Sequence, residues 1–174
     1  MRRFDDPAQF LRFMQGMPQR LRTAAHAGLT DGARIIQHEA TAEIGHYQGE
    51  AGPFPAWEEL DKDTKAQRVA LGFTENDPLL RTGALRDHID MTAGAEKATI
   101  GVPHEVVGDG SKANPIRDIG DVATYLELGT SHMPPRSFLG GAAVRKTSQA
   151  VDAAAGAVAA ALAGLPPRRT PGAR

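Results

Sequence analysis

The chain has 174 residues, a length that predicts one domain with a real core rather than two full domains. Its 20 basic and 21 acidic residues give a net charge of −1, so no global field favours nucleic acid or an anionic membrane. The lack of cysteine excludes disulfides, thiolate catalysis and cysteine-ligated metal. Only 5% of the residues are aromatic, and alanine supplies much of the apolar content. Because such a core buries little area per residue, we expect stability to depend on burial against other subunits.

The two ends of the chain predict neither a leader nor an anchor. Acids and a proline follow the first two arginines, where a signal peptide needs an apolar run. The most apolar stretch, 150–165, includes Asp152 and is shorter than the roughly 20 residues of a membrane span. We therefore expect a soluble protein without a membrane partner. Residues 1–165 are predicted as a single α+β domain, and the proline- and arginine-rich residues 166–174 as a disordered tail.

Two helices are predicted in the first third of the chain. A short helix begins with Pro7 in its first turn and Asp6 as its cap. A long helix covers 18–47, where apolar residues recur every three or four positions. Gly28 and Gly32 weaken that helix and would permit a kink there.

A second long helix is predicted to begin at Ser137. Its apolar residues follow steps of three and four, as in a heptad seam: Val144, Ser148, Val151, Ala155, Val158, Leu162 and Leu165. The alanine-rich part of this helix allows a neighbouring helix to approach closely. Two interpretations stay open, namely packing on the domain's own sheet and a seam shared between subunits.

The segments between the long helices are predicted as loops and short strands. Residues 48–78 are loop-rich, with a short helix from Trp57 to Val69. Strands are expected near 88–92 and over 97–103, joined as a hairpin, and again over 123–130, where side chains alternate. A polar, glycine-rich, mobile loop is expected over 104–121. With the helices, this pattern predicts an α+β fold whose small antiparallel sheet packs against a long N-terminal and an alanine-rich C-terminal helix.

Candidate chemistry is sparse. His38, Glu43 and His46 invite a metal site, but a zinc-protease helix needs two histidines four apart, and a di-iron site needs a second ligand pair. The segment 108–115 lacks the ending of a phosphate-binding loop, and the neighbours Ser131 and His132 lack an orienting acid. We therefore expect no catalytic, cofactor-binding or metal-binding residues.

Four segments, taken in order, resemble a known family. They are "AWEELDKDTKAQR" (56–68), "LLRTGALRDHI" (79–89), "ATIGVP" (98–103) and "ATYLELGTSHMPPRSFLGGAA" (123–143). Together they resemble the tail-completion, or head–tail joining, proteins of long-tailed bacteriophages and gene transfer agents. The resemblance covers roughly 20–160. Ser137 stands where the family has a proline, and a serine there can still cap the helix that follows.

The resemblance implies a structural virion protein, a minor tail component without catalysis, located in the tail or neck and assembled in the cytoplasm of the host bacterium. Its expected partners are further copies of itself in a ring, as a hexamer or dodecamer, a connector or portal-side protein, and the tail tube or tail terminator. DNA would only pass through the lumen. The expected structural or interface residues are Trp57, Leu80, Gly83, Leu85, Arg86, Tyr125, Glu127, Gly129, Thr130, Arg136, Phe138, Val151 and Val158.

The pair Glu127 and Arg136 has several possible roles at this stage. By the resemblance, the two side chains would bridge one element's end to the start of the next helix or reach an adjacent subunit. As an exposed pair they would contribute under about 1 kcal/mol. Two other functions stay open: another neck role, such as tail terminator, connector or head-closure protein, and a small metal-binding enzyme or regulator that uses His38, Glu43, His46 or His88.

Overall fold

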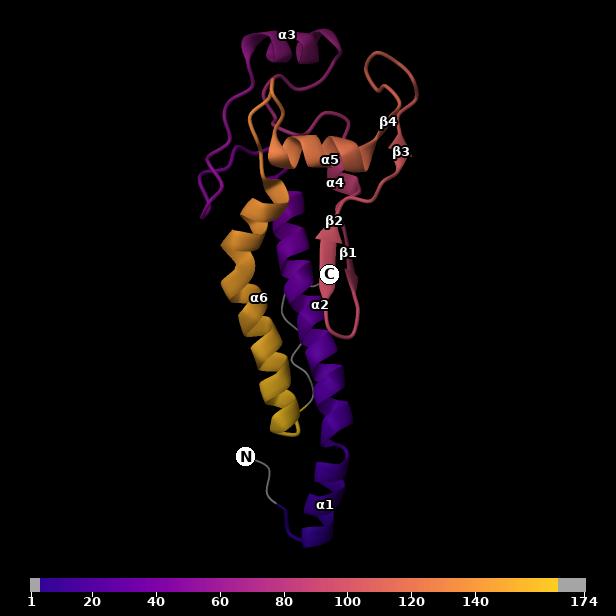
Figure 1. Cartoon of the computed structure of the whole chain (residues 1–174), viewed down its shortest axis with the longest axis vertical. Coiled ribbons are helices and arrows are strands. Elements are labelled where there is room, and N and C mark those ends of the chain that lie inside the picture. Colours follow the sequence, from indigo (N-terminus) through magenta and orange to yellow (C-terminus); the bar gives the residue numbers. More distant parts are fainter. Residues whose placement is uncertain (1–3, 166–174) are drawn as a thin grey trace. The chain divides into compact units, whose positions relative to one another are not determined.

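The computed structural model describes residues 4–165, so the tail predicted over 166–174 lies outside the described residues. The fold is α+β: small antiparallel strands pack against a long N-terminal helix and an alanine-rich C-terminal helix, which confirms the predicted fold class (Figure 1). The elements in chain order are α1 (Pro7–Gln15), α2 (Met17–Glu43), α3 (Lys62–Ala70), α4 (Ala84–Asp87), β1 (Asp90–Ala93), β2 (Ala98–Gly101), β3 (Val106–Val107), β4 (Arg117–Asp118), α5 (Ile119–Leu128) and α6 (Phe138–Leu162).

The described chain groups into two compact units. Unit 1 consists of 4–35, 91–99 and 147–165, and unit 2 of 36–90 and 100–146. Helices α2 and α6 each contribute residues to both units. None of the described helices is long and apolar enough to cross a membrane.

Local signals in the sequence explain how unit 1 begins. The Asp6 side chain accepts a hydrogen bond from the backbone N–H of Ala8 at 3.0 Å, and Pro7 opens α1, as predicted. Helix α2 confirms the predicted long helix, although it ends at Glu43 rather than at residue 47. Strands β1 and β2 form the predicted hairpin, and His26 on α2 contacts the carbonyl of Gly94 in its turn at 2.8 Å.

The two glycines of α2 mark where α6 approaches it. A Cβ on Gly28 would lie 2.7 Å from the Cα of Ala154, and one on Gly32 would lie 3.0 Å from the carbonyl oxygen of Ala150. These helices lie side by side with their backbones in near contact (Figure 1). Within unit 1, α6 thus packs on α2 through small residues.

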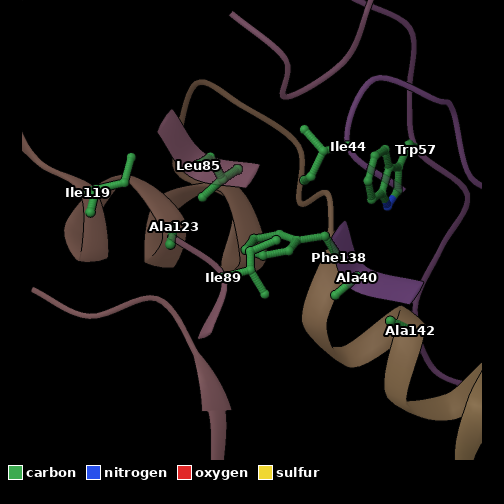
Figure 2. Close-up of a cluster of buried hydrophobic side chains, with 9 residues drawn as sticks. All are labelled: Ala40, Ile44, Trp57, Leu85, Ile89, Ile119, Ala123, Phe138 and Ala142. Carbon is green, nitrogen blue, oxygen red and sulfur yellow. The ribbon is translucent and has the colours of Figure 1, made fainter. Parts of the chain in front are cut away.

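Unit 2 holds the main hydrophobic core. Figure 2 shows the ring of Phe138 near the middle of this cluster. Phe138 is fully buried, and its neighbours come from α2, the 48–61 loop, α4, α5 and α6. The buried members are Ala40, Ile44, Trp57, Leu85, Ile89, Ile119, Ala123, Phe138 and Ala142.

The strand predicted over 123–130 is wrong, because this segment belongs to α5 and to the turn after it. Asp118 caps the helix by accepting hydrogen bonds from the backbone N–H groups of Gly120 and Asp121, and Gly129 ends it at a φ of 75°. Ile119 and its neighbour Gly120 are both buried, together with Ala123, which fits one face of a helix, whereas neighbours in a strand face opposite sides.

Two loop predictions also need correction. The segment 104–121 contains the antiparallel pair β3–β4 and the start of α5, so only 104–105 and 108–116 lie outside helices and strands. The mobility of this segment stays a prediction. The helix predicted from Trp57 to Val69 is the shorter α3, which begins only after Asp61, whose side chain caps it. The side chain of Trp57 lies in the core instead.

Candidate functional site

The segment 126–140, here called the corner, links α5 to α6 and contains the charged residues that the sequence singled out. The Glu127 carboxylate accepts hydrogen bonds from the backbone N–H groups of Leu139 and Gly140, both at 2.9 Å. These N–H groups belong to the first turn of α6 and have no partner within the helix. A carboxylate there also interacts favourably with the positive end of the helix dipole. Glu127 therefore caps α6.

The serine that replaces the family's proline has a different role from the one predicted. Ser137 directly precedes α6, but its Oγ donates to the backbone carbonyl of Glu127 at 2.9 Å. The backbone N–H of Arg136 donates to the carbonyl of Leu126 at 2.7 Å. Ser137 thus ties the end of α5 to the start of α6, while the cap itself comes from the Glu127 side chain.

Arg136 joins the corner to a distant part of unit 2. Its side chain is 4% exposed, and Nε and Nη2 both donate to the backbone carbonyl of Glu58, at 3.3 and 2.9 Å. Burial lowers the pKa of Arg136, and the nearby Tyr47 and Glu58 oppose that shift. Because Glu58 follows the buried Trp57, this contact fastens the 48–61 loop to the corner.

A tight turn between α5 and α6 brings these groups into place. Gly129 has a φ of 75°, and a Cβ on it would lie 2.8 Å from the nitrogen of Pro135. Thr130 and Met133 form an isolated antiparallel bridge just after it. Only glycine suits both the positive φ and the close approach, so this residue fixes the reversal of the chain.

The residues of 79–89 that carry the family resemblance also serve packing. Gly83, at a φ of 87°, precedes α4, and Leu85 is buried in the core. Leu80 packs against this core, and its carbonyl accepts a hydrogen bond from the buried Arg68. Arg86, by contrast, is exposed and lies 3.2 Å from the carboxylate of its neighbour Asp87.

The remaining interface candidates lie at the surface. Tyr125 on α5 is exposed, as is Val151 on α6, and Val158 is half-buried. Val151 and Val158 line the same open groove of unit 1.

Among the described residues, the histidines first considered for metal binding do not converge. Within residues 4–165, the one group of three possible ligands consists of His104, Asp118 and Asp121, whose ligand atoms lie within 4.8 Å of one another. Asp118 already caps α5, and the His104 Nδ1 lies 3.1 Å from its carboxylate. His104 is largely exposed, so these contacts hold the helix end without defining an enclosed site.

A buried acid escaped the sequence analysis as a structural feature. Glu43 ends α2 and is 3% exposed, and neither carboxylate oxygen has a hydrogen-bond partner in the described part of the chain. Burial raises the pKa of Glu43 to about 7; Arg145, 3.2 Å away, opposes the shift, whereas Glu39 and Glu127 add to it. A glutamate within a predicted helix is ordinarily expected on the exposed face, so no local signal in the sequence points to its burial.

The corner can hold three elements in a fixed geometry, but it presents no exposed acid–base pair. The Glu127 carboxylate accepts from backbone N–H groups, and the Arg136 guanidinium donates to a backbone carbonyl. The two side chains therefore bond the backbone rather than each other. No protein-family model matches this chain, and neither a curated protein nor a solved structure matches it significantly.

Proposed function

We propose that this chain is a structural virion protein of the head–tail junction, which forms a ring that joins the portal or connector to the tail tube and completes the tail. The ordered resemblance of four segments motivates the proposal. The observation that carries the proposal is that the polar side chains of the corner bond the protein's own backbone. Glu127, Arg136 and Ser137, which lie in the segment with the resemblance, all bond backbone groups of the same chain.

This use of charge fits a joining part better than an enzyme. A catalytic acid or base must be within hydrogen-bond reach of a substrate, whereas within residues 4–165 the hydrogen bonds of these side chains all go to backbone groups of their own chain. A part that transmits position between neighbours instead needs rigid connections between its elements. The corner provides one, because it connects α5, α6 and the 48–61 loop through five hydrogen bonds from or to three side chains.

The proposal is tested by reconstituting the joint. DNA-filled heads bearing their connector and separately purified tails are mixed with and without the full-length chain, and joined particles are counted by negative-stain microscopy. We expect joining only with the chain present, and a ring of density at the junction. If joining proceeds equally well without the chain, or if the chain never sediments with either particle, the proposal is wrong.

The same experiment separates the neck roles. A completion protein is needed for joining finished tails, whereas a tail terminator is needed while the tube grows, so omitting it gives tails of uncontrolled length. Addition of the chain during tube growth therefore distinguishes the two. Metal analysis of the purified protein, with alanine at His38, His46 and His88, tests the remote enzymatic alternative.

A further inference from the structure

The α6 helix of unit 1 turns its larger apolar side chains outward. Its buried positions there are small, namely Ala157, Ala160 and Ala161. Val151 and Leu162 are 58% and 54% exposed. A helix that packs only within its own domain shows the opposite distribution, with large apolar residues inside. The outward stripe therefore indicates a surface that another molecule covers.

This stripe forms one wall of an open apolar groove in unit 1. The groove has a volume of about 810 Å³, and Glu96 is the charged residue in its lining. Its residues come from α2, the β1–β2 turn and α6: Ala25, Leu29, Ala95, Glu96, Val151, Ala154, Ala155, Val158, Ala159 and Leu162. From Val151 to Leu162 the wall spans about 16 Å of helix at 1.5 Å per residue.

Unit 1 also contains a half-exposed apolar helix face, on which Phe10 has an aromatic neighbour, Phe4. Helix α1 has no buried residue, and Phe10, Leu11 and Met14 are each about half exposed. These three side chains share one face, because they lie one and four positions apart on a helix. The nine residues of α1 span about 14 Å, which matches the length of the groove wall.

The α1 helix of the same chain is held away from this groove. Gly16, the single residue between α1 and α2, has a right-handed helical conformation. The Arg20 guanidinium lies 4.2 Å from the centre of the Phe13 ring and bonds the Phe13 carbonyl. Helix α1 therefore continues beyond the N-terminal end of α2, whereas the groove begins at Ala25, more than two turns into α2.

We propose that α1 of one copy lies in the α2–α6 groove of a second copy. The residues after Leu165 include no large apolar side chain, so they do not supply an alternative occupant from the sequence. The two faces differ, so every copy both offers α1 and accepts one, and a head-to-tail series is the arrangement that suits the proposed ring. Closure of this series into a ring rests on the proposed function. A single contact of this size buries less area than a standard stable interface, so the free protein associates weakly. In a closed ring every copy makes two such contacts, which stabilises the assembly.

Cysteine cross-linking tests the contact directly, because the natural chain has no cysteine. One full-length protein carries Leu11→Cys and another carries Val151→Cys, and the two are mixed at high concentration under mild oxidation. We expect a mixed disulfide dimer that forms at least about tenfold faster than in the control pair, since docking raises the local thiol concentration. The control pairs Leu11→Cys with Val69→Cys, which is as exposed as Val151 but lies on α3.

Each other outcome contradicts the proposal. Val151→Cys chains that cross-link with each other faster than with Leu11→Cys chains indicate that two grooves pair face to face. A double variant that cross-links within one monomer shows that α1 folds into its own groove. A mixed pair that cross-links no faster than the control means that no second copy uses this groove.

A further variant gives a positive check. Met14→Asp, added to the Leu11→Cys chain, should reduce the rate of mixed cross-linking to that of the control pair.

The particle-joining experiment, run on the same variants, separates the two proposals. Joining that persists when the mixed cross-link is absent overturns only the α1 contact. A failure of the natural chain to join particles, with the cross-link present, overturns only the proposed function.

Discussion

Units 1 and 2 are built by opposite uses of side-chain size. Unit 2 buries a large aromatic ring, Phe138, among Trp57 and aliphatic residues from several segments. Unit 1 brings α2 and α6 together through Gly28, Gly32 and alanines, and leaves larger side chains such as Val151 at the surface. Unit 2 thus buries large apolar side chains, whereas unit 1 leaves several of its own exposed.

The difference predicts that substitutions in the two units have different effects on stability. Large buried side chains supply most of the free energy of burial, so unit 2 should dominate the stability of the single chain. Close backbone contact between helices depends on the absence of side chains, so unit 1 should be sensitive to added atoms. The predictions below address these two sensitivities in turn.

The largest effect is expected in the unit 2 core. Phe138→Ala removes a fully buried ring and leaves a cavity, so the free energy of unfolding should fall by about 3–5 kcal/mol. Urea unfolding followed by circular dichroism measures the change. The matched control is Val151→Ala in unit 1, whose exposed side chain should change stability by under about 0.5 kcal/mol. Equal losses for the two variants would show that unit 1 buries Val151 in the free chain.

This contrast bears on what could be predicted from the sequence. The start of α1 was predictable because it depends on two neighbouring residues, Asp6 and Pro7. The alternation over 123–130 misled because it spans too few residues to distinguish two periods, although Asp118 and Gly129 bracket the helix as cap and stop. Capping signals were therefore more informative there than side-chain alternation.

For the candidate site, the sequence identified the residues but not their partners. The sequence drew attention to Glu127 and Arg136, but their partners are backbone groups of Leu139, Gly140 and Glu58, which chain folding alone brings near. Arg136 meets a residue 78 positions away. A long-range contact of this kind leaves no trace in local spacing, so the residues could be picked out while their role could not.

The second effect concerns the buried acid of unit 2. Glu43 has a pKa of about 7 in the folded protein and its ordinary 4.5 when exposed. Between these values the folded state keeps a proton that the unfolded chain has lost. Its contribution to stability is therefore fully present below about pH 4.5 and is lost as the pH rises to about 7, by about 3 kcal/mol in all.

Glu43→Gln should remove this dependence, because the amide does not titrate. We expect urea midpoints of the natural chain to fall between about pH 5 and pH 7.5, and those of the variant to stay nearly constant over that range. The control is Glu50→Gln, an exposed glutamate, which should keep the natural fall. A parallel fall in the Glu43→Gln protein would mean that another group is responsible.

The smallest effect compares two glycines of unit 1 by the same substitution. Glycine to alanine within an exposed helix gains about 1 kcal/mol from backbone entropy, and Gly156 on α6 has open space around it, so Gly156→Ala should stabilise by up to that amount. At Gly28 the new Cβ would lie 2.7 Å from the backbone of Ala154, so α2 and α6 must separate. Gly28→Ala should therefore destabilise by about 1–2 kcal/mol despite the better helix former.

Thermal melting of the two variants beside the natural chain shows whether each substitution raises or lowers the melting temperature. Because the substitution is identical, helix propensity cancels in the comparison and the difference reports the contact between α2 and α6. Stabilisation of both variants would show that these helices do not touch at Gly28 in solution. In that case the wall formed by α6 would no longer stand beside Ala25 and Leu29, and the groove that receives α1 would have to be sought elsewhere.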